Sequence, residues 1–159
     1  MHRVKRGLVG YVSYLAACEM NESFSEYMLY EPTLRILTAQ RWQVQCEYPC
    51  PGYPKQGAGD FKKLDFVCTD GQRGSFGIEM KWARKAKLSV ASDMEKLQKY
   101  IQATPGSRGF LCVFGRKSDI EHLVLSAEGI TERGNAIYAE FGVTRFGCRN
   151  YEVRASSSG

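Results

Sequence analysis

The sequence predicts an α/β fold in which a helix, three strands, a second helix and a further strand follow one another. Three observations predict it. Residues 42–48 alternate between apolar and polar side chains, as in a strand with one buried face. Residues 109–114 (GFLCVF) form a continuous apolar run, which is typical of a strand covered on both faces. Between them, the apolar side chains of residues 89–103 recur at the spacing of one helix face.

The composition favours a single globular domain. The chain has 159 residues, 43% hydrophobic and 25% charged, which is enough to bury one core and argues against wholesale disorder. We expect a domain over residues 1–154, a disordered tail at 155–159 and a cytoplasmic location without a membrane span. The net charge of +5 favours a polyanionic partner such as nucleic acid.

The N-terminal segment allows two interpretations. Apolar side chains within residues 7–20 have helical spacing, which predicts an amphipathic first helix. The basic start MHRVKR, followed by an apolar stretch ending at Cys18, also resembles a lipoprotein signal. Gly10, Ser13 and Tyr14 make that stretch a poor signal core, so we favour the helix.

The next elements are placed by capping and turn residues. A second helix is expected over residues 23–40, because Ser23 and Glu26 have the spacing of a capping box. Pro32 either kinks this helix or restarts it. Residues 49–59, rich in proline and glycine, are expected to form a loop.

A hairpin and a less regular C-terminal part are expected to complete the domain. The hairpin joins strands at 61–68 and 74–82 through the Asp70-Gly71 turn signal. Residues 119–125 fit a short helix or a strand, and further strands fit the ranges 136–146 and 149–154.

This hairpin carries the candidate chemistry. Side chains alternate along a strand, so Glu79 and Lys81 share one face. A turn centred on Gln72 places Asp65 opposite Glu79. Directly opposed carboxylates destabilise a hairpin unless a cation lies between them, and Mg²⁺ suits such a pair. The alternative is that all three residues form a solvated polar face, and a shifted register would separate the carboxylates.

The order of elements over residues 23–114, with Asp65 followed by Glu79-Met80-Lys81, resembles the αβββαβ core of the PD-(D/E)XK nuclease superfamily, which includes restriction endonucleases. The resemblance implies a mixed central sheet flanked by helices and Mg²⁺- or Mn²⁺-dependent hydrolysis of phosphodiester bonds in DNA. It implies that Asp65, Glu79 and Glu26 bind the metal and that Lys81 assists the attacking water.

Some assignments within this resemblance have competitors. Glu22 and Glu31 are alternatives to Glu26, which could instead serve only in the capping box. Asp60 is a second candidate for the aspartate role. The proline that precedes this aspartate in the family is replaced here by Leu64.

Two further groups are candidates for binding nucleic acid. Arg84, Lys85 and Lys87 follow the catalytic strand and can contact the phosphate backbone. Lys96 and Tyr100 are four residues apart on the next helix, and related nucleases often place a Lys or Gln and a Tyr there, facing the site. A solvated surface is the alternative for both groups.

Several other functions are not supported. The chain has two histidines, no GxxxxGK[ST] or GxGxxG motif, and six cysteines without a CxxC pair. The second functional hypothesis is a catalytically inactive member of the same superfamily that acts as a binding or adaptor protein. Because so short a chain shows no recognition domain, high sequence specificity would need a homodimer or a protein partner.

Overall fold

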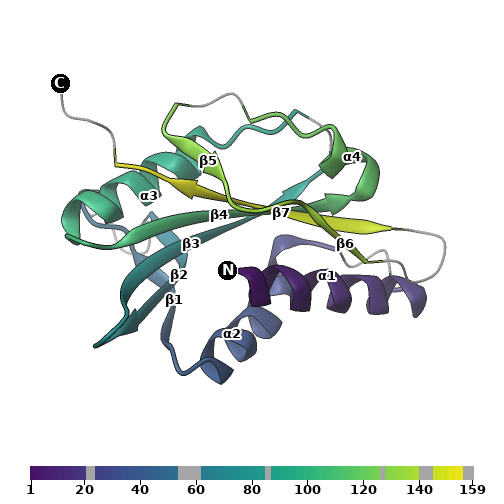
Figure 1. The fold of residues 1–159 in the computed structure, drawn as a ribbon, viewed down its shortest axis with the longest axis horizontal. Helices are drawn as coiled ribbons and strands as arrows, with labels where there is room; N and C mark the ends of the chain where they lie inside the picture. The colour runs from purple at the N-terminus through teal and green to yellow at the C-terminus, as the bar shows by residue number, and fades with distance from the viewer. Residues whose placement is uncertain (21–23, 54–61, 85–86, 126–127, 140–144, 156–159) are drawn as a thin grey trace.

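The computed structural model describes residues 1–20, 24–53, 62–84, 87–125, 128–139 and 145–155. Within these residues seven strands form one mixed sheet, which is flanked by helices (Figure 1). The predicted α/β class is therefore confirmed. No helix in the described part of the chain is both long and apolar enough to cross a membrane.

The elements follow in the order α1 (His2–Ala17), the 3-10 helix η2 (Glu26–Leu29), α2 (Tyr30–Ala39), β1 (Gln43–Pro49), β2 (Lys63–Asp70), β3 (Gly74–Ala83), α3 (Ala91–Ala103), β4 (Arg108–Arg116), α4 (Lys117–Glu121), β5 (Ile130–Glu132), β6 (Ile137–Ala139) and β7 (Phe146–Val153). The strand order is β1-β2-β3-β4-β7-β5, and β6 also pairs with β7. The β3–β4 pair is parallel, with α3 as its crossover helix, and the other pairs are antiparallel.

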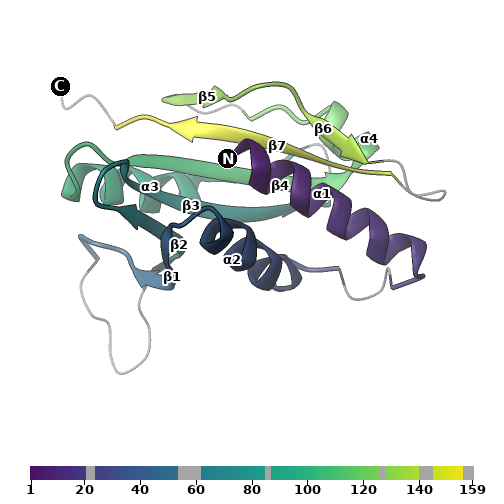
Figure 2. The same ribbon diagram turned by 60° about the horizontal axis from the view of Figure 1, so that its bottom comes forward.

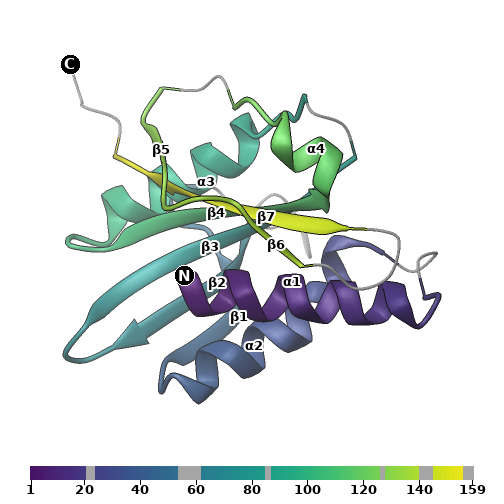
Figure 3. The ribbon, with the colours of Figure 1, turned by 45° about the vertical axis from the view of Figure 1, so that its right-hand side comes forward.

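The helices divide between the two faces of the sheet. Figures 1 and 3 show α1 and α2 on one face and α3 and α4 on the other. Figure 2 shows the first of these faces, with α1 and α2 both turned towards the viewer. Each face has its own apolar cluster, so the central strands β3 and β4 are buried from both sides, as parallel pairs in α/β proteins usually are. The apolar run predicted as a doubly covered strand is β4.

Helix α1 belongs to the core and begins earlier than the predicted residue 7. Val4 and Leu8 are fully buried against the sheet. Lys5 is also buried, and its Nζ donates a hydrogen bond of 2.6 Å to the backbone oxygen of Asn135. The amphipathic interpretation of this segment is therefore confirmed for the described residues.

The predicted second helix is divided in two. Residues 26–29 form η2, and Pro32 lies in the first turn of α2, where its missing N–H costs no hydrogen bond. Of the two alternatives predicted for Pro32, the structure shows a helix that restarts and not one that is kinked. Ser23, the predicted capping residue, lies outside the described residues, as do most of the loop predicted at 49–59 and all but Ala155 of the predicted tail.

The register predicted for the β2–β3 hairpin is observed from Asp70–Gly74 to Phe66–Ile78, but the ladder ends there and does not include the predicted pair of Asp65 with Glu79. The expected alternation fails at one place, however. Leu64 packs on the α3 face, whereas Phe66 packs on the α1–α2 face, although residues two apart in a regular strand share a face. The break falls at Asp65, beside the neighbouring strand's Glu47, which has a positive φ of 48°.

Candidate active site

The predicted aspartate lies where β2 and β3 stop pairing. Phe66 and Ile78 form the last backbone pair of the hairpin. Beyond it, Oδ2 of Asp65 accepts a hydrogen bond of 2.6 Å from the backbone N–H of Met80. Oδ1 of Asp65 accepts a hydrogen bond from the hydroxyl of Tyr30 on α2. The carboxylate is thus fixed between β3 and α2, at the break in side-chain alternation.

Glu79 is the most buried of the predicted site residues, with an exposed fraction of 1%. Its Oε2 accepts a hydrogen bond of 2.5 Å from Lys96 Nζ on α3. Its Oε1 is buried and has no hydrogen-bond partner within the described residues. A buried carboxylate oxygen without a partner carries a desolvation cost, and native structures leave few such atoms unexplained.

The two carboxylates influence each other's ionisation. Burial, followed by the charge of Asp65, raises the pKa of Glu79 to about 9, although the ammonium of Lys96 acts in the opposite direction. Burial also raises the pKa of Asp65, against the hydrogen bonds donated by Tyr30 and Met80. Mutual repulsion between neighbouring acids in a dry site is the situation in which a divalent cation binds favourably.

Two lysines and a third acid complete the cluster on the α3 side. Lys81 Nζ lies 3.0 Å from Oδ2 of Asp93, and Lys96 Nζ lies 3.5 Å from Oδ1 of the same residue. Asp93 is only 7% exposed. Burial lowers the pKa of Lys81, but its hydrogen bond to Asp93 and the nearby glutamates outweigh burial and raise it overall. Both lysines therefore remain charged beside the carboxylates.

Glu26 lies at the start of η2, next to the end of β3. Its Oε1 accepts a hydrogen bond of 3.0 Å from the backbone N–H of Trp82. Its charge acts on Asp65 and on Lys81, so it belongs to the same neighbourhood. The competing Glu31 pairs with Arg35 on the exposed side of α2. The other competitors, Glu22 and Asp60, lie outside the described residues.

Two of the three predicted metal ligands, Asp65 and Glu79, are near enough for the charge of one to act on the other, and metal binding itself stays a prediction. Within the described ranges, no group of three or more His, Cys, Asp or Glu side chains is arranged to hold one ion. Asp65 and Glu79 nevertheless offer the donor set that hard cations prefer, including the partnerless Oε1 of Glu79. Mg²⁺ takes few protein ligands and retains several waters, so two carboxylates are sufficient. Glu26 as a ligand stays a prediction.

The predicted nucleic-acid contacts are dispersed. Arg84 and Lys87 are exposed after β3, and Lys85 lies outside the described residues. Lys96 points into the carboxylate cluster and not toward solvent. Tyr100 is 2% exposed and packs in the core at the edge of Tyr48. Its ring is therefore buried, whereas we expected it to be available for contact with nucleic acid.

The position of Tyr100 has a clear steric reason. Its ring lies over Gly77 of β3, where an added Cβ would come within 3.1 Å of Tyr100 Cδ1. The absence of a side chain at Gly77 makes room for the aromatic ring. Lys96, one helical turn earlier, contacts Glu79.

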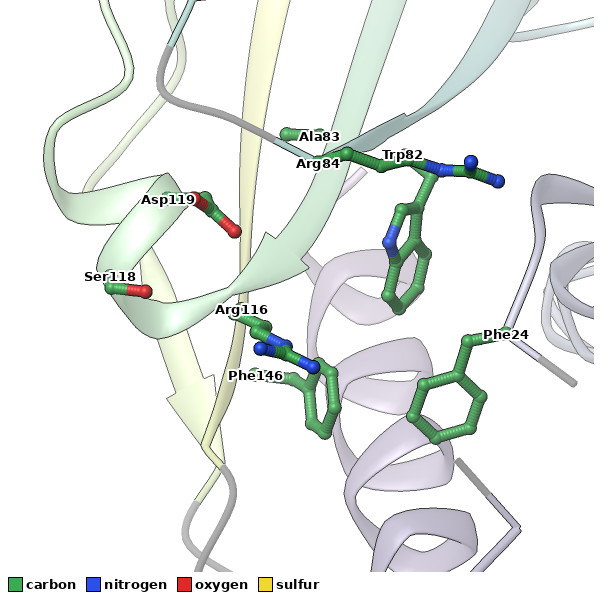
Figure 4. A pocket seen from close by; sticks show the side chains of 8 residues that line it. All are labelled: Phe24, Trp82, Ala83, Arg84, Arg116, Ser118, Asp119 and Phe146. Carbon is green, nitrogen blue, oxygen red and sulfur yellow. The ribbon is translucent and has the colours of Figure 1, made fainter. Parts of the chain in front are cut away.

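Two adjoining pockets lie at the end of β3, where Glu26 and Arg84 are the predicted site residues that line them. The larger has a volume of about 490 Å³ and is shown in Figure 4; it is lined by Phe24, Trp82, Ala83, Arg84, Arg116, Ser118, Asp119 and Phe146. The smaller, of about 310 Å³, is lined by Ser25, Glu26, Tyr27, Trp82 and Arg84. Trp82 and Arg84 belong to both, so the larger pocket leads towards Glu26.

Four residues of this region were not singled out from the sequence. Asp93 had a detectable signal, because it lies three residues before Lys96 on the same helix. Tyr30, Trp82 and Arg116 had none, since their roles depend on how α2, β3 and β4 pack together.

Comparison with known proteins gives no relatives: no family model, no curated protein and no solved structure matches this chain.

Proposed function

We propose that this chain is a metal-dependent nuclease that hydrolyses phosphodiester bonds of DNA and has a PD-(D/E)XK-type core. The observation that carries the proposal is the buried Oε1 of Glu79, which has no partner among the described residues, beside the fixed carboxylate of Asp65. The order α2-β1-β2-β3-α3-β4, with β3 and β4 parallel, supports the same αβββαβ core.

The carboxylates are arranged to hold a cation without losing their present contacts. Each oxygen of Asp65 accepts one hydrogen bond and has capacity for a further interaction. Mg²⁺ or Mn²⁺ held by Asp65 and Glu79 would activate the attacking water and stabilise the charge of the scissile phosphate. Tyr30 and the backbone of Met80 keep Asp65 in position, which limits the reorganisation needed during reaction.

Lys81 is the candidate for contact with the scissile phosphate. It shares a strand face with Glu79, and its ammonium is oriented by Asp93 at 3.0 Å. A fixed ammonium stabilises negative charge that develops on phosphate oxygens. Arg84, Lys85 and Lys87 continue the basic segment and are proposed to contact the flanking backbone.

Cleavage of plasmid and single-stranded DNA, with Mg²⁺, Mn²⁺ or chelator, tests the proposal. We expect cleavage that requires the metal and that is lost in Asp65→Asn and in Lys81→Ala. Glu31→Gln is the matched control, because Glu31 is an exposed acid on α2 with no contact to the cluster. Cleavage that survives both site substitutions, or that persists in chelator, contradicts the proposal.

An inactive binding or adaptor protein is the second candidate, and one observation favours it. Lys96 Nζ, at 2.5 Å from Glu79, already supplies a cation to the buried carboxylate. If that ammonium replaces the metal permanently, the fold persists without catalysis. Titration with Mn²⁺ separates the two candidates, because the inactive protein would show no saturable binding that depends on Asp65.

A further inference from the structure

The larger pocket combines aromatic walls with two arginines. Trp82, Phe24 and Phe146 form a cluster whose ring centroids lie 5.1–6.0 Å apart. The segments that supply them come from the end of β3, the chain before η2 and the start of β7. We call this space the aromatic pocket. Its volume of about 490 Å³ falls in the range of small-molecule sites.

The arginines of the aromatic pocket are not used elsewhere in the described structure. Arg84 and Arg116 are both exposed, and neither forms an ion pair with the residues that the structure describes. Figure 4 shows Arg84 above Trp82, and Arg116 beside Phe146. Planar guanidinium groups bind phosphate through paired N–H donors, so two of them near aromatic rings suit a ligand with both a phosphate and a ring.

One acidic residue lies on the opposite wall. In Figure 4 the carboxylate of Asp119 faces the interior of the pocket, across from Trp82. A carboxylate repels a phosphate but accepts hydrogen bonds from ring N–H and amino groups. Among the nucleobases, guanine presents two such donors side by side on its Watson–Crick edge. The walls therefore separate a phosphate side from a base side.

We propose that the aromatic pocket holds one unpaired nucleotide of a DNA strand, with its base between Trp82 and Asp119 and its phosphate near Arg84 and Arg116. The proposal rests on the proposed function in so far as the bound strand is the one to be cleaved. Stacking of bases on aromatic rings is tolerant of sequence, and phosphate contacts fix the strand's position.

The position of the aromatic pocket at the end of β3 indicates how a bound nucleotide would position the DNA strand. Trp82 follows Lys81 directly on β3, and its backbone N–H is bound by Glu26. The indole itself packs on the sheet face opposite Lys81, so a nucleotide held against it lies at the end of β3, on the side of Glu26. The pocket would set the register of the DNA backbone over Asp65 and Glu79, and would favour strands with an unpaired nucleotide beside the cleaved bond.

Fluorescence of Trp82 provides a direct test. The chain contains two tryptophans, so Trp42→Phe leaves Trp82 as the only reporter. In chelator, which prevents cleavage, this protein is titrated with a short oligothymidylate that contains one dG. A strand of the same length with an abasic residue at every position and inorganic phosphate serve as the other two ligands. We expect saturable quenching by the dG oligonucleotide and affinity weaker by about fivefold or more for the abasic one.

Matched arginine variants identify the phosphate side. Arg116→Gln and Arg84→Gln are each expected to weaken binding and to reduce the slope of log affinity against log salt by about one. Arg154→Gln carries the same charge change at the opposite end of β7 from Phe146 and is expected to bind normally. Equal affinity for the abasic strand, or equal effects of Arg116→Gln and Arg154→Gln, overturns the proposal.

The outcomes also separate this inference from the nuclease proposal. Quenching by the dG oligonucleotide without cleavage under any metal condition would retain the pocket and reject catalysis. Metal-dependent cleavage without any response of Trp82 would do the reverse. Phosphate that competes as well as the oligonucleotide would show an anion site only, and the nucleotide assignment would then be wrong.

Discussion

Lys96 Nζ lies 2.5 Å from Oε2 of Glu79, while the other oxygen of that carboxylate is buried without a partner in the described structure. One carboxylate therefore has one oxygen neutralised by an ammonium and one left for another cation. Asp65, beside it, is held by Tyr30 and Met80. Because of this asymmetry, we expect the stability of the fold to depend on metal, on pH and on the charge of Lys96.

Metal should stabilise the folded chain. Because the two carboxylates are close only in the folded state, Mn²⁺ at a hundred times its dissociation constant is expected to add about 2.7 kcal/mol to the free energy of unfolding. For a chain of this size that is roughly 5–10 °C in Tm. Thermal unfolding with Mn²⁺ and with chelator measures the effect. Asp65→Asn should abolish the shift and Glu31→Gln should retain it; equal shifts in both would contradict the assignment of the ligands.

The stability of the metal-free protein should fall as the pH rises. Folding raises the pKa of Glu79 from its ordinary 4.5 to about 9, so the folded state holds this proton more tightly than the unfolded state. The stabilising contribution is complete below about 4.5 and is lost progressively towards pH 9, at up to about 1.4 kcal/mol per pH unit. Asp65 has a raised pKa and acts in the same direction.

The variant Glu79→Gln isolates this effect, because the amide keeps the shape of the side chain and cannot ionise. In chelator at alkaline pH it is expected to be more stable than the parent by at least ~1 kcal/mol. Near pH 4 the two should be similar. Urea unfolding at several pH values gives the comparison. A parent protein that is as stable at pH 9 as at pH 5 would show that Lys96 neutralises Glu79 fully.

The ammonium of Lys96 should be essential to the metal-free fold. Lys96→Met removes the charge partner of Glu79 and leaves Asp93 with Lys81 alone. Above the pKa of Glu79, about 9, that carboxylate is ionised, and removing one member of the buried ion pair is expected to cost about 3–5 kcal/mol because the remaining charge is left unpaired. The double variant Glu79→Gln/Lys96→Met should recover much of this loss. Urea unfolding of both variants measures the coupling, and additive effects would argue against a direct interaction.

The hairpin register could be predicted from the sequence because the Asp70-Gly71 turn and the apolar pattern fix it together. The break at Asp65 could not, since it depends on β1, where Glu47 has an unusual backbone conformation. Tyr30 and Asp93 approach the site from opposite faces of the sheet. Their contributions are set by packing over long sequence separations, which no local pattern records.

The error at Tyr100 has the same origin. A spacing of four residues correctly placed Tyr100 near Lys96 on the helix, but spacing does not show which side chain points into the core. Tyr100 is buried because Gly77 has no side chain and leaves space for the aromatic ring. The helix itself was predicted correctly, because its apolar face is periodic over the whole segment.

Two tyrosines of this region differ in exposure, and this difference predicts different effects of their removal. Tyr100 is buried, so Tyr100→Ala is expected to destabilise the fold by about 3–5 kcal/mol, as for other large aromatic truncations.

Tyr27 lines the smaller pocket beside Glu26 and is 75% exposed, so Tyr27→Ala should leave stability within about 0.5 kcal/mol. Because exposed rings stack on unpaired bases, the same change should weaken binding of single-stranded DNA about fivefold or more. Chemical unfolding and a binding titration in chelator measure the two effects. Tyr14, exposed on α1, provides the control Tyr14→Ala, and DNA binding that falls equally in both variants would show that the loss at Tyr27 is not specific to the site.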